Sequence, residues 1–222
     1  MNIRLRFTKK KECTVLTWQG KIIIISAFTG IALFIFLKFP IFLSNNNPVN
    51  GKYLVLDGIM PDYSIQEAIE IFNNQNYTTV IATGSKLESG YFISEKKTMA
   101  ELTYATFIAL GFDSANVIVI PEGDILKDRT YTSALSLKKY FDKHQISSAD
   151  VDVLALGCHA RRSRILFQLA LGENYKVGII AVPDNSFNIN KWWKTSKGVR
   201  TVVGETIAYI YAKIFFYPDK NE

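Results

Sequence analysis

Cysteine is scarce in this sequence, and its placement excludes a disulfide-stabilised domain. The 222 residues include two cysteines, Cys13 and Cys158. A long hydrophobic run separates them and neither belongs to a C-x-x-C motif, so we predict no disulfide and no cysteine-based metal site. Internal repeats, low-complexity tracts, G-x-G-x-x-G and Walker patterns are also absent from the sequence. With 48% hydrophobic and 21% charged residues, the chain has globular composition and a length suited to one domain plus an appendage.

The predicted domain lacks an excess of charge of either sign. The formal net charge is +6, and all of it lies before residue 51, where seven lysines and arginines face the single acidic residue Glu12. From residue 51 onward, basic and acidic residues balance. A protein that binds nucleic acid carries its excess charge on the folded surface. We therefore predict no nucleic-acid partner.

The charge instead flanks the one long hydrophobic run, at 22–43. About 20 helical residues cross a hydrocarbon core of ~30 Å, so this run is long enough to span a lipid bilayer if Lys38 reaches the far interface. It ends in PIFLSNNNP, which lacks the small-residue site of a cleaved signal peptide. We expect a retained transmembrane anchor.

The positive-inside rule gives this anchor a direction. It places the basic segment 1–21 in the cytoplasm and the chain after the anchor on the outer face of a bacterial-type cytoplasmic membrane. A polar stretch at 44–51, SNNNPVNG, is the predicted linker to a single domain at 52–222.

Short apolar β-type runs alternate with amphipathic helical stretches along that domain. Such alternation predicts a doubly wound, mainly parallel five-stranded sheet with helices on both faces, a Rossmann-like three-layer α/β sandwich. The expected strands are 53–57, 78–83, 116–120, 151–157 and 176–182, and the expected helices are 64–74, 95–110, 131–143, 160–171 and 197–216.

Residues that follow the predicted strands are candidates for a ligand site. Ligands of such sheets bind outside the carboxyl ends of the strands, where the strand order reverses. Asp57 and Gly58 follow the first strand, and Asp57 can act as a base or as a ribose or metal ligand. Thr83, Gly84 and Ser85 follow the second, and their backbone N–H groups can bind an anion, although a plain turn fits the same residues.

The most informative stretch is GCHARRSR at 157–164. Arg161 and Arg162 open a predicted helix, where cations oppose the positive end of the macrodipole and call for a compensating anion. They can clamp a phosphate or carboxylate, with His159 as acid or base. Arg129, at another helix start, repeats the pattern. From the residues alone, solvated arginines and a structural histidine are an equally good interpretation.

Five further residues are candidates with two interpretations each. Glu95 and Thr130 stand at predicted helix starts, as caps or as pocket residues. Glu205 lies in the last helix and either pairs with an arginine or faces water. Trp192 and Trp193 lie between lysines in a predicted loop, as a lid over the pocket or as a contact with lipid headgroups.

The order of these motifs resembles the YdcF/SanA/ElyC-like family, whose members often carry an N-terminal membrane anchor. The shared stretches are LVLDG at 54–58, the turn at 83–85, Glu95, Asp128-Arg129-Thr130, His159-Ala160-Arg161-Arg162, and the tail residues Trp193, Ser196, Gly198 and Glu205. Two features depart from the family's pattern: the first helix lacks the family's early arginine, and the Ser-Gly-Gly turn is Thr-Gly-Ser here. The resemblance implies a Rossmann-like fold, a role in cell-envelope biology such as peptidoglycan or lipid-carrier metabolism, and a functional site around His159.

We therefore expect a membrane-anchored envelope protein whose domain binds, and in one version processes, a phosphorylated lipid-carrier or sugar phosphate. The alternatives are a non-catalytic envelope-integrity factor and a nucleotide-dependent transferase. The sequence indicates no metal, and it specifies neither a cofactor nor an oligomeric state.

Overall fold

One helix, α1 (Trp18–Leu43), is long and apolar enough to cross a membrane. A computed structural model describes residues 13–58, 60–125 and 127–218, so the predicted cytoplasmic arginines and lysines before residue 13 lie outside the described residues. The chain divides into two compact units, Met1–Lys38 and Phe39–Glu222.

The division places the last turn of α1 in the second unit, whereas the predicted anchor continues to Leu43. Leu43 is fully buried and Pro40 is buried, and both lie in the second unit. The part of α1 that remains for a bilayer runs from Trp18 to Lys38, which at ~1.5 Å per residue is about 31 Å long and still sufficient.

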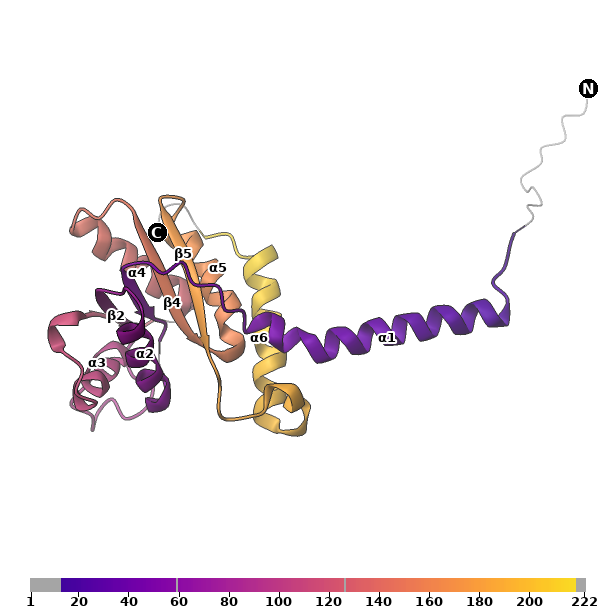
Figure 1. The fold of residues 1–222 in the computed structure, drawn as a ribbon, viewed down its shortest axis with the longest axis horizontal. Helices are drawn as coiled ribbons and strands as arrows, with labels where there is room; N and C mark the ends of the chain where they lie inside the picture. The colour runs from indigo at the N-terminus through magenta and orange to yellow at the C-terminus, as the bar shows by residue number, and fades with distance from the viewer. Residues whose placement is uncertain (1–12, 59, 126, 219–222) are drawn as a thin grey trace, which may run out of the picture. The chain divides into compact units, whose positions relative to one another are not determined.

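The second unit contains the predicted parallel sheet of five strands. These are β1 (Tyr53–Leu56), β2 (Thr79–Gly84), β3 (Val117–Pro121), β4 (Ala149–Leu156) and β5 (Tyr175–Val182). Their order is β3-β2-β1-β4-β5 and every pair is parallel (Figure 1). The order reverses between β1 and β4, where Leu54 aligns with Asp152. The α/β fold predicted from the sequence is confirmed.

Helices cover both faces of this sheet because its strands are apolar on both sides. The helices are α2 (Asp62–Asn74), α3 (Met99–Ala109), α4 (Arg129–Lys143), α5 (Ala160–Leu171) and α6 (Ser196–Ile214). The core cluster on one face includes Val55, Leu137 and Phe167, which come from β1, α4 and α5. The cluster on the other includes Leu54 and Phe107, from β1 and α3. Helix α6 packs on α5.

The start of α3 differs from the prediction. A capping box sets it, in which Glu101 N donates to Thr98 Oγ1 over 3.2 Å and Thr98 N donates to Glu101 Oε2 over 3.0 Å. This reciprocal pair fixes the helix at Met99 rather than at Glu95. The Glu95 side chain is exposed, its carboxylate lies 3.9 Å from Lys96, and it opens no helix.

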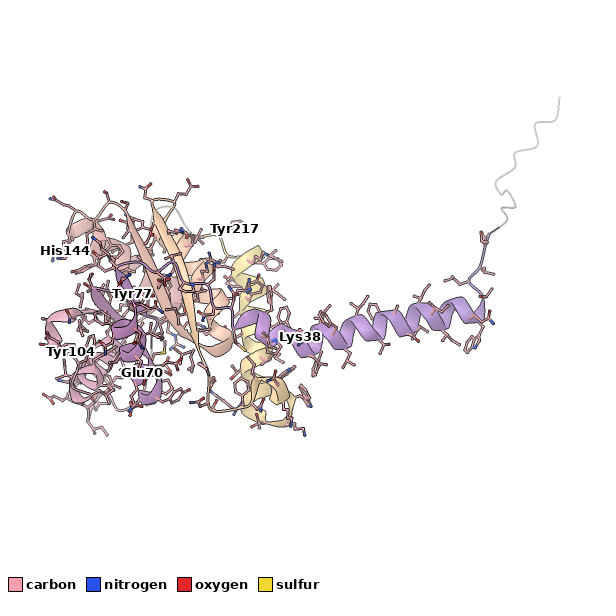
Figure 2. The ribbon with its side chains drawn as sticks, in the orientation of Figure 1. Lys38, Glu70, Tyr77, Tyr104, His144 and Tyr217 are labelled. Atoms are coloured by element: carbon pink, nitrogen blue, oxygen red, sulfur yellow. The ribbon has the colours of Figure 1, made fainter. Side chains whose placement is uncertain are left out.

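The segment predicted as a polar linker is bonded to the sheet. Asn47 exchanges both backbone hydrogen bonds with Ile179 at the edge of β5. Asp152, buried within β4, accepts from Val49 N over 2.7 Å and from Gly51 N over 3.2 Å. Tyr77, labelled in Figure 2, donates to the same carboxylate over 2.8 Å. The chain is therefore held from its first residues after α1.

Candidate functional site

A cavity of about 620 Å³ lies at the carboxyl ends of the strands. It adjoins the reversal of strand order between β1 and β4, where doubly wound sheets bind ligands. Most of the predicted site residues line it: Asp57, Gly58, Gly84, Ser85, Arg129, Thr130, His159, Arg162 and Glu205.

His159 lies between two carboxylates in this cavity. It ends η2 (Gly157–His159), the short 3-10 turn that follows β4. Its Nε2 lies 3.0 Å from Asp57 Oδ2, and its Nδ1 lies 3.2 Å from Glu205 Oε1. Asp57 also accepts from the Ser163 hydroxyl over 2.5 Å. The histidine thus joins the end of β1 to α6.

These contacts favour a protonated imidazole. Burial on its own lowers the pKa of His159, but the hydrogen bonds to Asp57 and Glu205 outweigh burial and raise this pKa to about 9. The guanidinium of Arg162, with Nη2 2.8 Å from His159 Nδ1, opposes protonation in part. The two carboxylates therefore favour the charged form of His159 at neutral pH.

Arg162 forms an ion pair inside the protein. Its Nε donates to Glu205 Oε2 over 2.9 Å and its Nη2 donates to Glu205 Oε1 over 3.1 Å. Burial raises the pKa of Glu205, but the bonds from His159 and Arg162 prevail and lower it to about 2. Of the two interpretations of Glu205, pairing with an arginine is the one observed. The Nε and Nη2 groups of Arg162 are therefore occupied by Glu205, and its role as an anion clamp stays a prediction.

Two other predicted site residues lie away from the cavity. Arg161 donates from Nε to the carbonyl of Phe42 over 2.6 Å, and its guanidinium lies 3.8 Å from the centre of the Phe42 ring. Thr83 is fully buried, and its hydroxyl donates to Leu56 O over 2.9 Å. Arg161 thus holds the end of α1, and the Thr83 side chain links β2 to β1.

The turn after β2 is close to its helix because of Gly84. A Cβ there would lie 2.6 Å from Met99 Cβ and 3.0 Å from Ala100 N, so only glycine permits the first turn of α3 to approach. Glu95, by contrast, is outside the cavity lining.

Arg129 and Thr130 reach the cavity from the start of α4. Arg129 is exposed and forms an ion pair with Glu88, a surface contact that contributes little stability. Thr130 Oγ1 lies 3.5 Å from His159 Nε2. Asp128, which precedes them, has a left-handed backbone and no side-chain cap.

The two tryptophans lie in a 3-10 segment, η3 (Ile189–Lys194), rather than in an open loop. Trp192 is buried in a cluster that includes Leu43, Cys158 and Tyr209. Trp193 is 39% exposed. Neither lines the cavity, so a lid role finds no support, whereas contact with lipid by Trp193 stays a prediction.

Lys197 and Arg200 were missed by the reasoning from sequence. Both occupy the first turns of α6, line the cavity and are exposed, and within the described ranges neither has a hydrogen-bond or ion-pair partner. The argument applied to Arg161 and Arg162, that cations at a helix start call for an anion, applies equally to KTSKGVR at 194–200 and would have found them.

Glu122 is a third residue near the cavity that was not among the predicted site residues. It follows β3 and is 7% exposed, and its Oε2 accepts from the Ser133 hydroxyl over 2.9 Å. Its Oε1 has no hydrogen-bond partner within the part of the chain that the structure describes. Burial raises the pKa of Glu122 to about 7, against the hydrogen bond from Ser133 and with the help of the Asp57 charge. Ser133 lines the cavity, so Glu122 lies directly behind its wall.

Among residues 13–58, 60–125 and 127–218, no group of three or more His, Cys, Asp or Glu side chains could hold a metal ion. Comparison of the chain with models of known families, with curated proteins and with solved structures found no match. The resemblance to the YdcF/SanA/ElyC-like family stays a prediction.

Proposed function

We propose that the cavity binds a phosphorylated intermediate of the cell envelope, and that α1 anchors the domain to the outer face of the membrane. Lys197 and Arg200 supply the positive charge for the phosphate, and the first turn of α6 adds the positive end of its dipole. His159, whose pKa is raised to about 9, is the proposed acid, and a bound anion would compete with Asp57 and Glu205 for its N–H groups.

One observation carries this proposal. Lys197 and Arg200, which have no hydrogen-bond or ion-pair partner among the residues that the structure describes, lie at a helix start beside a cavity at the switch point of the sheet, whereas the neighbouring Arg162 is already paired with Glu205. Uncompensated positive charge at the positive end of a helix is unfavourable until an anion binds. A bound phosphate would remove this repulsion through charge-assisted hydrogen bonds, which contribute roughly 1.5–3 kcal/mol each.

A structural observation also favours the non-catalytic alternative. Both nitrogens of His159 are engaged by carboxylates and Arg162 is engaged by Glu205, so this cluster is satisfied without a ligand. In that case the cavity serves envelope integrity through binding alone, or the cluster joins β1, β4 and α6 as a structural link.

Thermal unfolding of the full chain in detergent, with and without inorganic phosphate, pyrophosphate and a short-chain polyprenyl phosphate, tests the proposal. We expect the phosphorylated ligands to raise the unfolding midpoint of the wild-type chain. In Lys197→Ala/Arg200→Ala this rise should be lost. The matched control is Lys139→Ala/Lys143→Ala, which removes two exposed cations from α4 and should retain the full rise.

Two results would contradict the proposal. One is the absence of stabilisation by any phosphorylated ligand, and the other is equal stabilisation of both double variants. Nucleotides and nucleotide sugars belong in the same series, since a response to them alone would favour the nucleotide-dependent transferase. His159→Gln then separates binding from chemistry: a variant that binds the ligand normally and still complements a chromosomal deletion supports the non-catalytic version.

A further inference from the structure

Helix α6 exposes a continuous apolar stripe. Val199, Val203, Ile207, Ile210 and Ile214 follow one another at intervals of three or four residues, so they lie on one face of the helix. Each is between 38% and 64% exposed. Single exposed apolar residues are ordinary, but a row of five on one helix marks an interaction surface.

Packing within the domain does not account for this stripe. The side that α6 turns to the domain carries Val202, Tyr209 and Ala212, which are buried against neighbouring elements. At about 100° per residue, the stripe lies roughly 60–160° around the helix from these positions. Helix α6 therefore has two apolar faces, of which one is buried in the domain and the other, the stripe, is exposed.

The end of α1 lies against the same helix. The Phe42 ring meets the Tyr209 ring edge-on with centroids 5.6 Å apart, and Leu43 shares a buried cluster with Val202 and Tyr209. Lys38, the last residue of the first unit (Met1–Lys38), precedes Phe42 by four residues, or about 6 Å of helix. Covalent continuity therefore keeps α6 close to the place where the chain leaves a bilayer.

The charges around the stripe complement a lipid surface. Lys191, Lys194 and Lys197 precede it, with Trp193 partly exposed among them, and Arg200 lies within its first two turns. Apolar side chains along one helix face, bordered by lysines and a tryptophan, are the composition of helices that lie in the headgroup region of a membrane.

From these observations we infer that the exposed face of α6, together with η3, lies on the lipid bilayer that α1 spans. Arg200 and Tyr211 line the cavity and lie within about 40° of Ile207 around the helix, so the cavity opens beside the lipid surface. The phosphate group of a lipid carrier would then enter the cavity while the hydrocarbon tail of the carrier remains in the bilayer. This consequence rests on the proposed function, whereas the docking of α6 does not.

The test uses the full chain reconstituted into phosphatidylcholine vesicles with and without phosphatidylglycerol. In a Cys13→Ser background, an environment-sensitive fluorophore is attached at Ile207→Cys, with Lys143→Cys at the end of α4 as the matched control. Lipids that carry a quencher near the headgroup report contact. We expect blue-shifted emission and several-fold greater quenching at position 207 than at position 143, with the difference larger in the anionic vesicles.

A second variant guards against labelling artefacts. With the fluorophore at Val203→Cys, the changes Ile207→Glu and Ile210→Glu should remove most of the quenching while the chain stays in the vesicle. Equal, aqueous-type emission at 207 and 143 would overturn the inference. So would a blue shift without lipid quenching that grows with protein density, because that result assigns the stripe to a second copy of the chain. Neither outcome depends on phosphate binding, so the two proposals can fail separately.

Discussion

The buried carboxyl of Glu122 gives a pH dependence that can be measured at the level of one residue. Its pKa of about 7 lies above the ordinary value of 4.5 because burial disfavours the ionised form. The folded state then holds this proton more tightly than the unfolded chain does, so stability falls as the pH rises from about 4.5 through about 7. The loss is about 3.5 kcal/mol at most, at ~1.4 kcal/mol per pKa unit.

Glu122→Gln should remove this loss, since glutamine keeps an acceptor for Ser133 and has no charge to bury. We expect the variant to be more stable than wild type above about pH 7 and similar to it near pH 4. Unfolding midpoints across this pH range measure the difference. Glu95→Gln, an exposed carboxylate, should follow the wild-type curve, and a Glu122→Gln curve that does the same would refute the assignment.

Adjacent arginines with different partners provide a second prediction at this scale. Arg162→Ala leaves the carboxylate of Glu205 with His159 as its remaining partner, and because each side chain of the Arg162–Glu205 pair is about one-fifth exposed, the expected cost is near the lower end for a buried pair, roughly 3 kcal/mol. Arg161→Ala loses a contact with the Phe42 ring, and about 1 kcal/mol is expected. Denaturant unfolding of both variants compares them directly. Equal losses would mean that the pair with Glu205 is not formed in solution.

At the scale of one element, the start of α3 can be located by mutation. Thr98→Ala removes the side chain that caps the helix and should cost about 1 kcal/mol. Ser94→Ala, four residues earlier, removes a hydroxyl that only accepts from Lys96 N and should stay within about 0.5 kcal/mol of wild type. Thermal unfolding of the two variants measures both effects. A larger loss of stability in Ser94→Ala would indicate that the helix begins at Glu95, as the sequence predicts, rather than at Met99.

Elements were easier to predict than their partners. The order of strands and helices follows from local alternation of apolar runs, and α5 begins and ends where the sequence indicated. The pairing of Arg162 with Glu205 joins positions 43 residues apart, and no local pattern specifies it. The burial of Leu43 and the bonds of Asp152 to residues 49 and 51 likewise depend on tertiary packing. Local sequence therefore predicts Leu43 as part of the anchor and residues 49 and 51 as part of a linker.

At the scale of the whole molecule, the charge distribution predicts a topology. All of the net charge of +6 lies before residue 51, so the basic end should remain in the cytoplasm. A reporter enzyme that is active only outside the cytoplasm, fused after Glu222, should therefore be active in bacterial cells. The fusion should also keep its full length on maturation, which electrophoresis measures. Activity of a strictly cytoplasmic reporter at the same position would reverse the orientation.

The contacts of Cys158 have a mechanical consequence. Its Sγ lies 3.7 Å from the carbonyl oxygen of Pro40 and 3.6 Å from the Ser44 hydroxyl, and the next residue in the chain is His159. Asn47, four residues after the end of α1, is bridged to Ile179 of β5, so the segment between α1 and the sheet is short. Tension between a membrane and the domain would therefore act on a residue that adjoins the cavity histidine as well as on the edge of the sheet.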